Sequence, residues 1–330
     1  MQYNFNIQRE FSSKLVLTTA YVGSRGVHLW RESDFNIAVP LDSPFDTRFA
    51  PVATPVRRNP NFGSIRFKAS DANSFYNSFQ LSVVSRFSRS FTGQLSYTFA
   101  KSIDDGSSSL GRNEFANGQA RSVDPFNLKL NRGLSDFDVR HRLSANFSYD
   151  LPFGPGRTYL AKAKGVTRVL VEGWQVNGIL TAETGIPVSP IFTFDQDRDA
   201  STDNEQRPNL APGVTSIPRV SRLQLFDPNL FVLPAVGSRG TLGRNTIGGP
   251  GLWTFDPSVT KNFYLSADHT RSIQFRTEIF NAFNHANFAI PDVSNLTIFN
   301  SATARNPTAG QITKTSTPSR QIQFALRLIF

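Results

Sequence analysis

The chain has 330 residues, 39% of them hydrophobic, and its 35 Lys and Arg against 25 Asp and Glu give a formal net charge of +10. No apolar run approaches the roughly 18 residues that suggest a membrane-spanning helix. The absence of cysteine excludes a disulfide framework, a thiol nucleophile and a cysteine-ligated zinc site. The basic residues are spread singly, without a run of five or more, which argues against nucleic-acid binding.

Apolar and polar residues alternate with a period of two through much of the chain, and this predicts β-strands with one apolar and one wet face. The first example opens the chain, where Tyr3, Phe5 and Ile7 alternate with polar neighbours. No stretch shows a convincing helical period, so we expect almost no helix. Each segment is near the roughly ten residues that a tilted strand needs to cross a bilayer. The predicted strands cover residues 3–8, 15–21, 79–87, 91–99, 142–151, 174–183, 255–265, 273–279 and 322–330.

The last predicted strand is the most regular. A terminal aromatic residue preceded by apolar residues at every second position resembles the final strand of bacterial outer-membrane β-barrels, which the barrel-assembly machinery reads. The alternative is an ordinary edge strand of a soluble sheet. The candidate assembly-signal residues are Phe324, Leu326, Leu328 and Phe330.

Short and long connections alternate strictly between the predicted strands. An up-and-down membrane barrel has short periplasmic turns and longer external loops, whereas a soluble sandwich has no reason to place every long loop at one end. We therefore predict an all-β fold, an antiparallel up-and-down transmembrane β-barrel. The short connections cover residues 9–13, 88–90, 152–167 and 266–270, and the long ones 26–74, 102–136, 185–251 and 285–319.

The number of predicted strands is nine, and single-chain bacterial barrels have even numbers. An unclosed sheet would leave two raw edges, which lipid does not tolerate. We therefore expect residues 1–330 to be the carboxy-terminal part of a larger barrel, with its earlier strands outside this sequence.

Several segments, in order and over nearly the whole chain, resemble the Oar-like family of TonB-dependent outer-membrane receptors, which carry a carboxypeptidase-regulatory-like domain. The resemblance implies the distal part of a 22-stranded barrel. The segments that carry it are Tyr-Val-Gly-Ser-Arg-Gly-Val-His-Leu at 21–29, Tyr-Thr-Phe-Ala-Lys-Ser-Ile-Asp-Asp at 97–105, Ser-Asp-Phe-Asp-Val-Arg-His-Arg-Leu at 135–143, Tyr-Asp-Leu-Pro-Phe-Gly at 149–154, Gly-Trp-Gln-Val-Asn-Gly at 173–178, Arg-Pro-Asn-Leu at 207–210 and Glu-Ile-Phe-Asn-Ala-Phe-Asn-His at 278–285.

This resemblance implies a bacterial outer-membrane receptor that imports a large or scarce solute with energy supplied through TonB. The expected partners are outer-membrane lipid, the barrel-assembly machinery, the protein's own amino-terminal strands and plug, and TonB. The alternatives are a passive or adhesive outer-membrane barrel without TonB coupling, and a soluble β-rich binding domain. The cargo is not encoded in any pattern we recognise.

The faces of the predicted strands suggest distinct roles. The phenylalanines would contact lipid, and Tyr21, Tyr149 and Trp174 would belong to the interfacial aromatic girdles. The inward polar residues would line the lumen or pack against a plug. The candidate lumen-facing arginines are Arg140, Arg142, Arg276 and Arg327.

No sequence motif indicates catalysis. None of the four histidines lies in a nucleophile or zinc-protease motif, so we predict neither an enzyme nor a cofactor. Four loop acids, at positions 114, 124, 136 and 138, have no partner that the sequence identifies.

One acidic stretch has the spacing of a calcium loop, with Asp195, Asp197, Asp199 and Asp203 at positions 1, 3, 5 and 9. However, Ala200 replaces the turn glycine, residue 206 is not an acid, and residue 198 is an arginine. The alternative is a solvated external loop.

Overall fold

The computed structural model describes residues 1–88, 90–107, 122–201, 206–266 and 268–330. Nine long strands pair antiparallel in chain order, and the short β5 (Gly133–Leu134) joins the same sheet through β4. The predicted fold class is confirmed. The nine strands are β1 (Gln2–Ser12), β2 (Leu15–Asp34), β3 (Arg66–Ser88), β4 (Phe91–Asp104), β6 (His141–Asp150), β7 (Trp174–Glu183), β13 (Leu252–Tyr264), β14 (Ser272–Phe280) and β16 (Gln321–Ile329).

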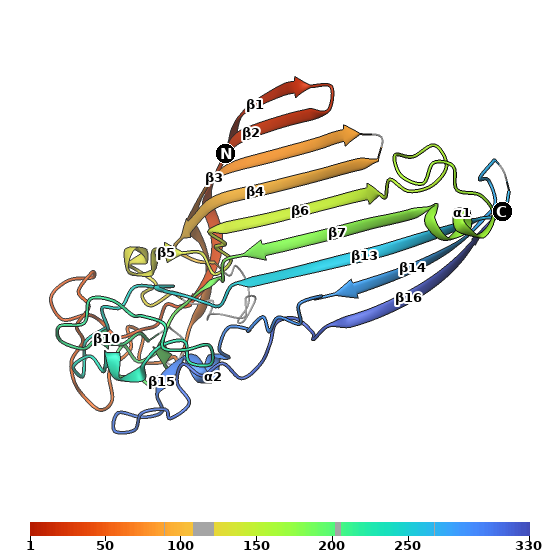
Figure 1. Cartoon of the computed structure of the whole chain (residues 1–330). Helices are drawn as coiled ribbons and strands as arrows, with labels where there is room; N and C mark the ends of the chain where they lie inside the picture. Colours follow the sequence, from red (N-terminus) through yellow and green to blue (C-terminus); the bar gives the residue numbers. More distant parts are fainter. Residues whose placement is uncertain (89, 108–121, 202–205, 267) are drawn as a thin grey trace.

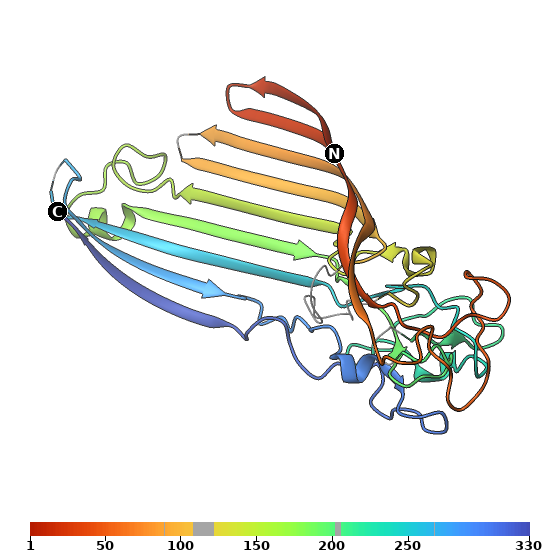
Figure 2. The ribbon, with the colours of Figure 1, turned by 180° about the vertical axis from the view of Figure 1, so that it is seen from behind.

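The sheet is twisted and open (Figure 1). Within the described residues β1 and β16 are the two edge strands, and they do not pair with each other. The four short connections and the C-terminus lie at one end of the sheet, which we call the turn end, and the long connections lie at the other, the loop end (Figures 1 and 2). The alternation of connection lengths therefore translates directly into a sheet with two unlike ends.

Cross-strand register aligns the strand faces. Directly paired residues point to the same side of a sheet, and Leu95 lies in register with Ala145, which in turn pairs with Leu180 and then Phe255. We call this side the apolar face. The opposite side, the polar face, carries Gln94 and the other residues of its parity. Further apolar-face residues are Phe79, Phe99, Phe147, Val259, Phe275, Phe324 and Leu326.

β2 and β3 are longer than predicted, because their pairing continues to Asp34 opposite Arg66. The loop expected over residues 26–74 is therefore wrong at both of its ends. The register shifts just after Gly26, where His28 has a φ of 56°. A bulge interrupts the period-two alternation while the backbone ladder goes on, so the pattern is lost before the strand ends.

Helix is scarce, as predicted. The structure contains α1 (Gly165–Val171) at the turn end, α2 (Val293–Leu296) at the loop end, and two short 3₁₀ helices, Leu128–Asn131 and Pro228–Leu230. Across the described residues, none of the helices combines the length and apolarity needed to cross a bilayer.

The long connections pack together into what we call the loop cap, the described residues of 35–65, 105–140, 184–251 and 281–320. Three two-stranded pairings tie it together: β8 (Pro187–Val188) with β12 (Ile247–Gly248), β9 (Ile191–Phe192) with β15 (Thr297–Phe299), and β10 (Asn209–Leu210) with β11 (Phe231–Val232). The cap has its own apolar core, which includes Leu225, Phe226 and Ile298. Leu225 and Phe226 are far from Ile298 in sequence, so no local pattern predicts their contact.

The two faces predict opposite responses to charge. Leu95→Arg places a guanidinium on the apolar face within the span of β4, whereas the adjacent Gln94→Arg places it on the polar face. We expect Leu95→Arg to lower the free energy of unfolding in phospholipid vesicles by about 2–4 kcal/mol, because charge on a lipid-facing position is costly. Urea unfolding measures the difference. Equal destabilisation by the two variants would contradict the assignment of the faces.

Candidate functional site

Three carboxylates, those of Asp124, Asp197 and Asp199, surround one arginine inside the loop cap, and together with the neighbouring Asp195 we call them the acid cluster. Arg239 Nη1 lies 2.7 Å from Asp124 Oδ2, Nε lies 3.2 Å from Asp197 Oδ2, and Nη2 donates to Asp199 Oδ2 at 3.1 Å. The Arg239 side chain is 2% exposed, and its guanidinium carbon lies 4.9 Å from the centroid of the Phe49 ring. One cation thus joins carboxylates from two separate loops.

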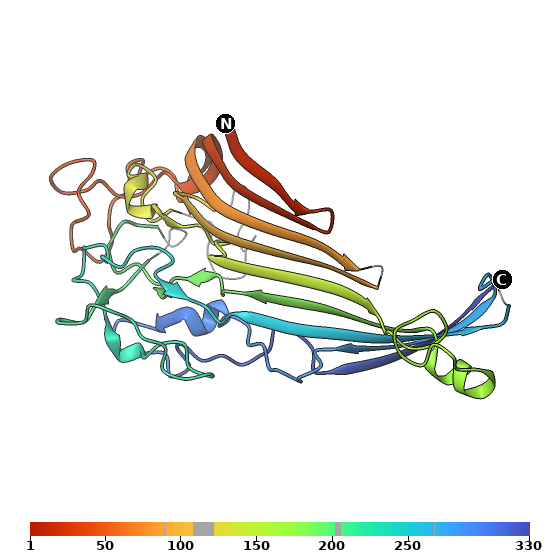
Figure 3. The same ribbon diagram turned by 45° about the horizontal axis from the view of Figure 1, so that its top comes forward.

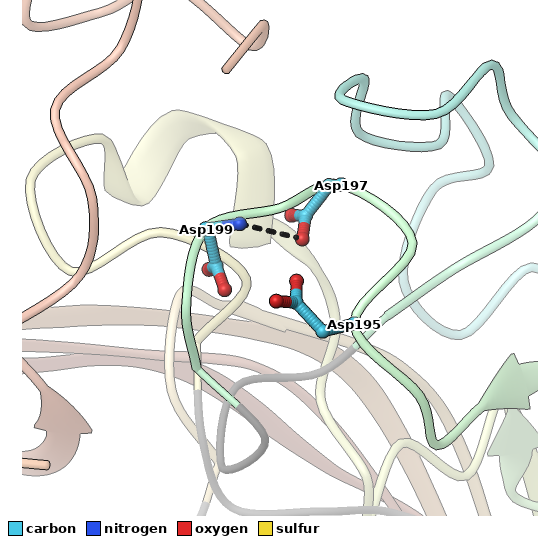
Figure 4. A group of neighbouring side chains, drawn as sticks. All are labelled: Asp195, Asp197 and Asp199. Atoms are coloured by element: carbon cyan, nitrogen blue, oxygen red, sulfur yellow. Dashed lines mark hydrogen bonds between the residues drawn. The ribbon is translucent and has the colours of Figure 1, made fainter. Parts of the chain in front are cut away.

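Asp195, Asp197 and Asp199 turn their side chains toward one another (Figure 4), with ligand atoms all within 4.8 Å. A backbone turn brings them together, because the Asp199 N–H donates to Asp197 Oδ1 at 3.3 Å. The same oxygen accepts from Gln206 Nε2 at 2.7 Å. Within the described residues, Asp195 Oδ1 is buried without a hydrogen-bond donor.

Burial and the proximity of like charges raise the pKa values of two acids in the cluster. Burial, together with the neighbouring Asp197 carboxylate, raises the pKa of Asp195 to about 6. Burial and the same neighbour raise the pKa of Asp199, against the opposing pull of Arg239. Asp195 and Asp199 therefore bind protons more readily than ordinary aspartates do.

The calcium site stays a prediction. Three of its four proposed ligands converge, and carboxylate oxygens are the ligands that Ca²⁺ prefers. Asp203 lies outside the described residues. Arg239 already supplies positive charge to Asp197 and Asp199. The alternative of a solvated loop is wrong for Asp197 and Asp199, which are 1% and 0% exposed, because the cap closes over this stretch.

A second buried cation joins the cap to the strands. Arg244 is ion-paired with Asp104, at the end of β4, and lies 3.8 Å from Asp136. Asn245 Nδ2 donates to Asp136 Oδ1 at 2.6 Å. Burial raises the pKa of Asp136 despite the nearby Arg244. These contacts fix residues 244–245 of the cap against the loop ends of the strands.

The loop acids therefore have partners. Asp124 pairs with Arg239, Asp136 accepts from Asn245, and Asp138 accepts from the backbone N–H of Ser102 at 2.6 Å. Glu114 lies outside the described residues. Sequence reasoning missed these pairs because the partners are 36 or more positions apart, although the segment at 135–143 contains Asp136 and Asp138.

A cavity of about 480 Å³ lies where the cap meets the strands. Its lining combines Asp138, Arg140 and Glu183 with Asn245 and a series of glycines. This hollowed junction therefore places side chains of both charges beside a mostly apolar lining.

Three of the four candidate lumen arginines have carboxylate neighbours. Arg140 Nη2 lies 3.4 Å from Asp138, Arg142 Nε 3.5 Å from Glu183, and Arg276 Nη2 2.8 Å from Glu278. Arg142 and Arg276 belong to the polar face of β6 and β14. Arg327 of β16 lies opposite Gln274 of β14 and therefore also belongs to the polar face.

The candidate assembly-signal residues share one exposed surface. Leu328, Leu326 and Phe324 lie opposite Ile273, Phe275 and Thr277 on the apolar face, and the rings of Phe275 and Phe324 stack with centroids 6.0 Å apart. Phe330 follows the last residue of β16 and is fully exposed. Recognition of this strand by the assembly machinery stays a prediction.

Removal of Arg239 tests whether it holds the cap together. Arg239→Ala leaves three buried carboxylates without their cation, and we expect the cap to lose about 3–5 kcal/mol of stability. Hydrogen exchange of amides 184–251 measures the loss. The matched control is Arg48→Ala, whose half-exposed guanidinium pairs with the exposed Asp42 and the more enclosed Asp46, and which should change stability much less. Equal effects would contradict this role.

The acid cluster predicts a pH dependence of defined sign. In the folded cap Asp195 holds its proton up to about pH 6, whereas in the unfolded chain it loses it near its ordinary pKa of 3.8. Stability is therefore fullest below that value and falls as pH rises through about 6. We expect larger protection factors, in which the exchange rate is corrected for the intrinsic base-catalysed rate, for amides 196–201 at about pH 5 than at about pH 7.5. Asp195→Asn should weaken this dependence, and Asp42→Asn, at an exposed site, should not.

The family comparison matches residues 1–323 to the model described as "Outer membrane beta barrel domain". No curated protein matches the chain. Among solved structures, the outer membrane transporter YddB from Escherichia coli is similar, with a TM-score of 0.50 and 12% identity over 98% of this chain and 31% of that one.

Two further structures are P. aeruginosa FpvA in a pyoverdine–iron complex (TM-score 0.43, 11% identity, 100% of this chain and 27% of that one) and the copper transporter OprC (0.36, 10%, 100% and 31%). The chain spans less than a third of each of these proteins. The matched model covers nearly all nine strands, so this chain belongs to the outer membrane beta barrel domain family and is a protein of the bacterial outer membrane.

Proposed function

We propose that this chain forms the distal wall and the external loops of an Oar-like TonB-dependent receptor, which takes up a large or scarce solute with energy supplied through TonB. The observation that carries the proposal is the loop cap, a packed structure with its own apolar core at the end of a lipid-facing sheet. A receptor needs such a preorganised surface, because ordering loose loops on each binding event would cost affinity.

The motif segments that resemble the Oar-like family support the proposal, because their polar residues occupy the joints of the cap. Asp104 and Asp136 accept from Arg244 and Asn245, and Arg207 donates to the Leu130 and Leu242 carbonyls. These are structural roles, and they explain why a sequence that builds this cap carries those segments.

The arrangement of charge suggests how a solute would pass. Arg140, Arg142 and Arg276 already have acidic neighbours, so they present a balanced polar lining rather than a trap for anions. The solute would bind first at the cap and its cavity and then move along the polar face. In the complete receptor a plug would block this route until TonB displaces it.

The open edges suggest further partners within the same protein. The outer sides of β1 and β16 carry backbone groups that the described residues leave unpaired. Such groups cost several kcal/mol each in lipid, so we infer that additional strands complete the barrel between these edges.

Energy coupling is tested by uptake in the source bacterium. Cells with and without the gene receive labelled iron chelates, oligosaccharides and peptides, and we expect gene-dependent accumulation of one class. An uncoupler of the proton-motive force should abolish it, since TonB draws on that force. Accumulation that persists in the uncoupler would favour the passive barrel and contradict the proposal. Cells with Arg239→Ala should lose accumulation while retaining the protein in the outer membrane.

A further inference from the structure

The β6–β7 connection is unlike the other short turns, because it contains a helix. The connection runs through residues 151–173, and α1 stands off the turn end of the sheet (Figure 3). Gly173 returns the chain to β7 with a φ of 77°, where a side chain would collide with the Asn262 carbonyl oxygen. Glycine at this position therefore fixes the path by which the chain leaves the connection and enters β7.

Helix α1 is attached to the apolar face. Trp174 and Lys261 lie in register with each other and with the apolar residues of that face. Trp174 Nε1 donates to the Leu170 carbonyl at 2.7 Å, and Lys261 Nζ donates to the Val169 carbonyl at 2.6 Å. Lys261 thus places a positive charge at the carbonyl end of the helix, which this charge stabilises. These bonds place the C-terminal turn of α1 over the lipid-facing side of the sheet.

The β13–β14 turn also holds the helix in place. Arg168 Nε donates to Glu172 Oε2 at 2.7 Å, and His269 Nε2 in the β13–β14 turn lies 3.5 Å from Glu172 Oε1. The His269 ring stacks on Tyr264 with centroids 3.9 Å apart. The orientation of α1 is therefore set by the neighbouring turn as well as by its own strands.

The outer surface of this turn combines apolar and basic residues. Val166, Val169 and Leu170 are 77%, 52% and 61% exposed, although their packing inward would remove apolar surface from water. Lys162 and Lys164, immediately before the helix, are also exposed. A surface of this kind is typical of segments that lie in a membrane interface, with apolar residues below the headgroups and cations among the phosphates.

The aromatic residues of the apolar face place α1 at the correct depth. Trp253 lies opposite Ala182, eight residues along β7 from Trp174. That separation is about 26 Å along the strand, or about 20 Å normal to the bilayer at the usual tilt, which suits two girdles bracketing a band about 25 Å tall. Trp174 marks the turn-end girdle, and α1 lies next to it.

We propose that α1 and the preceding lysines form an interfacial anchor that binds the phospholipid headgroups of the periplasmic leaflet. Val166 and Leu170 reach among the upper acyl chains, and Lys162 and Lys164 contact lipid phosphates. The surface is continuous with the lipid-facing side of the barrel, and its charge is opposite to that of anionic lipid. The proposal rests on the membrane location of the sheet and does not depend on energy coupling.

The absence of cysteine makes the test direct. Val166→Cys and Leu170→Cys, labelled with bimane in the full chain, are placed in phosphatidylcholine vesicles containing phosphatidylglycerol and lipids with a nitroxide quencher below the headgroup. The vesicles used are those in which a probe at Leu95→Cys is quenched, so the sheet spans the bilayer. We expect several-fold stronger quenching at both helix positions than at Asp268→Cys, an exposed residue in the neighbouring turn.

Substitution of Lys162→Ser with Lys164→Ser tests the headgroup contact. We expect quenching of the Val166→Cys probe to fall in vesicles with phosphatidylglycerol, toward its value in phosphatidylcholine alone. Quenching at Val166→Cys and Leu170→Cys no stronger than at Asp268→Cys would overturn the anchor. Quenching unaffected by the lysine substitutions in either lipid would overturn the role of the cations.

Discussion

The structure depends on one constraint, which is that every backbone N–H and C=O within lipid needs a partner from a neighbouring strand. The antiparallel ladder meets this need between the nine strands, but not on the outer sides of β1 and β16, and its register decides the side on which each residue lies. Because Leu95, Leu180 and Phe255 come from strands far apart in sequence and still share a face, the alternation must be correct in every strand at once. A slip of one residue in a single strand would put its polar side chains into hydrocarbon.

Outside the bilayer the long connections need a different source of stability. The loop cap cannot use a lipid-facing sheet for stability, so it buries its own apolar core and cross-links its loops with enclosed arginines. Buried ion pairs are weak evidence for net stability, because desolvation offsets much of their attraction. Their value lies in geometry, since Arg239 reaches its acids only when two loops meet in one arrangement. The same arrangement holds Asp195 beside Asp197 in a partly buried position, which raises the pKa of Asp195.

The two ends of the sheet are adapted to different surroundings. The loop end buries charge within a packed cap, and the turn end exposes apolar side chains beside a tryptophan and two lysines. This asymmetry matches the two environments of an outer-membrane barrel, which faces the exterior at one end and a phospholipid leaflet at the other. The same strands connect the two ends, so the sheet fixes the position of the cap relative to the membrane.

The sequence by itself determined the strands, their order and the unlike ends, because these follow from local alternation and from connection length. It also marked Asp104, Asp136 and Asp138 as belonging to notable segments, and it brought Asp195, Asp197 and Asp199 together by spacing alone. Only the tertiary structure decided that the pairing of β2 with β3 continues past Gly26, that Arg239 ion-pairs with Asp124, Asp197 and Asp199, and that Lys261 holds α1 against the apolar face. These features join residues tens of positions apart through packing, and no periodicity in a single segment records such contacts.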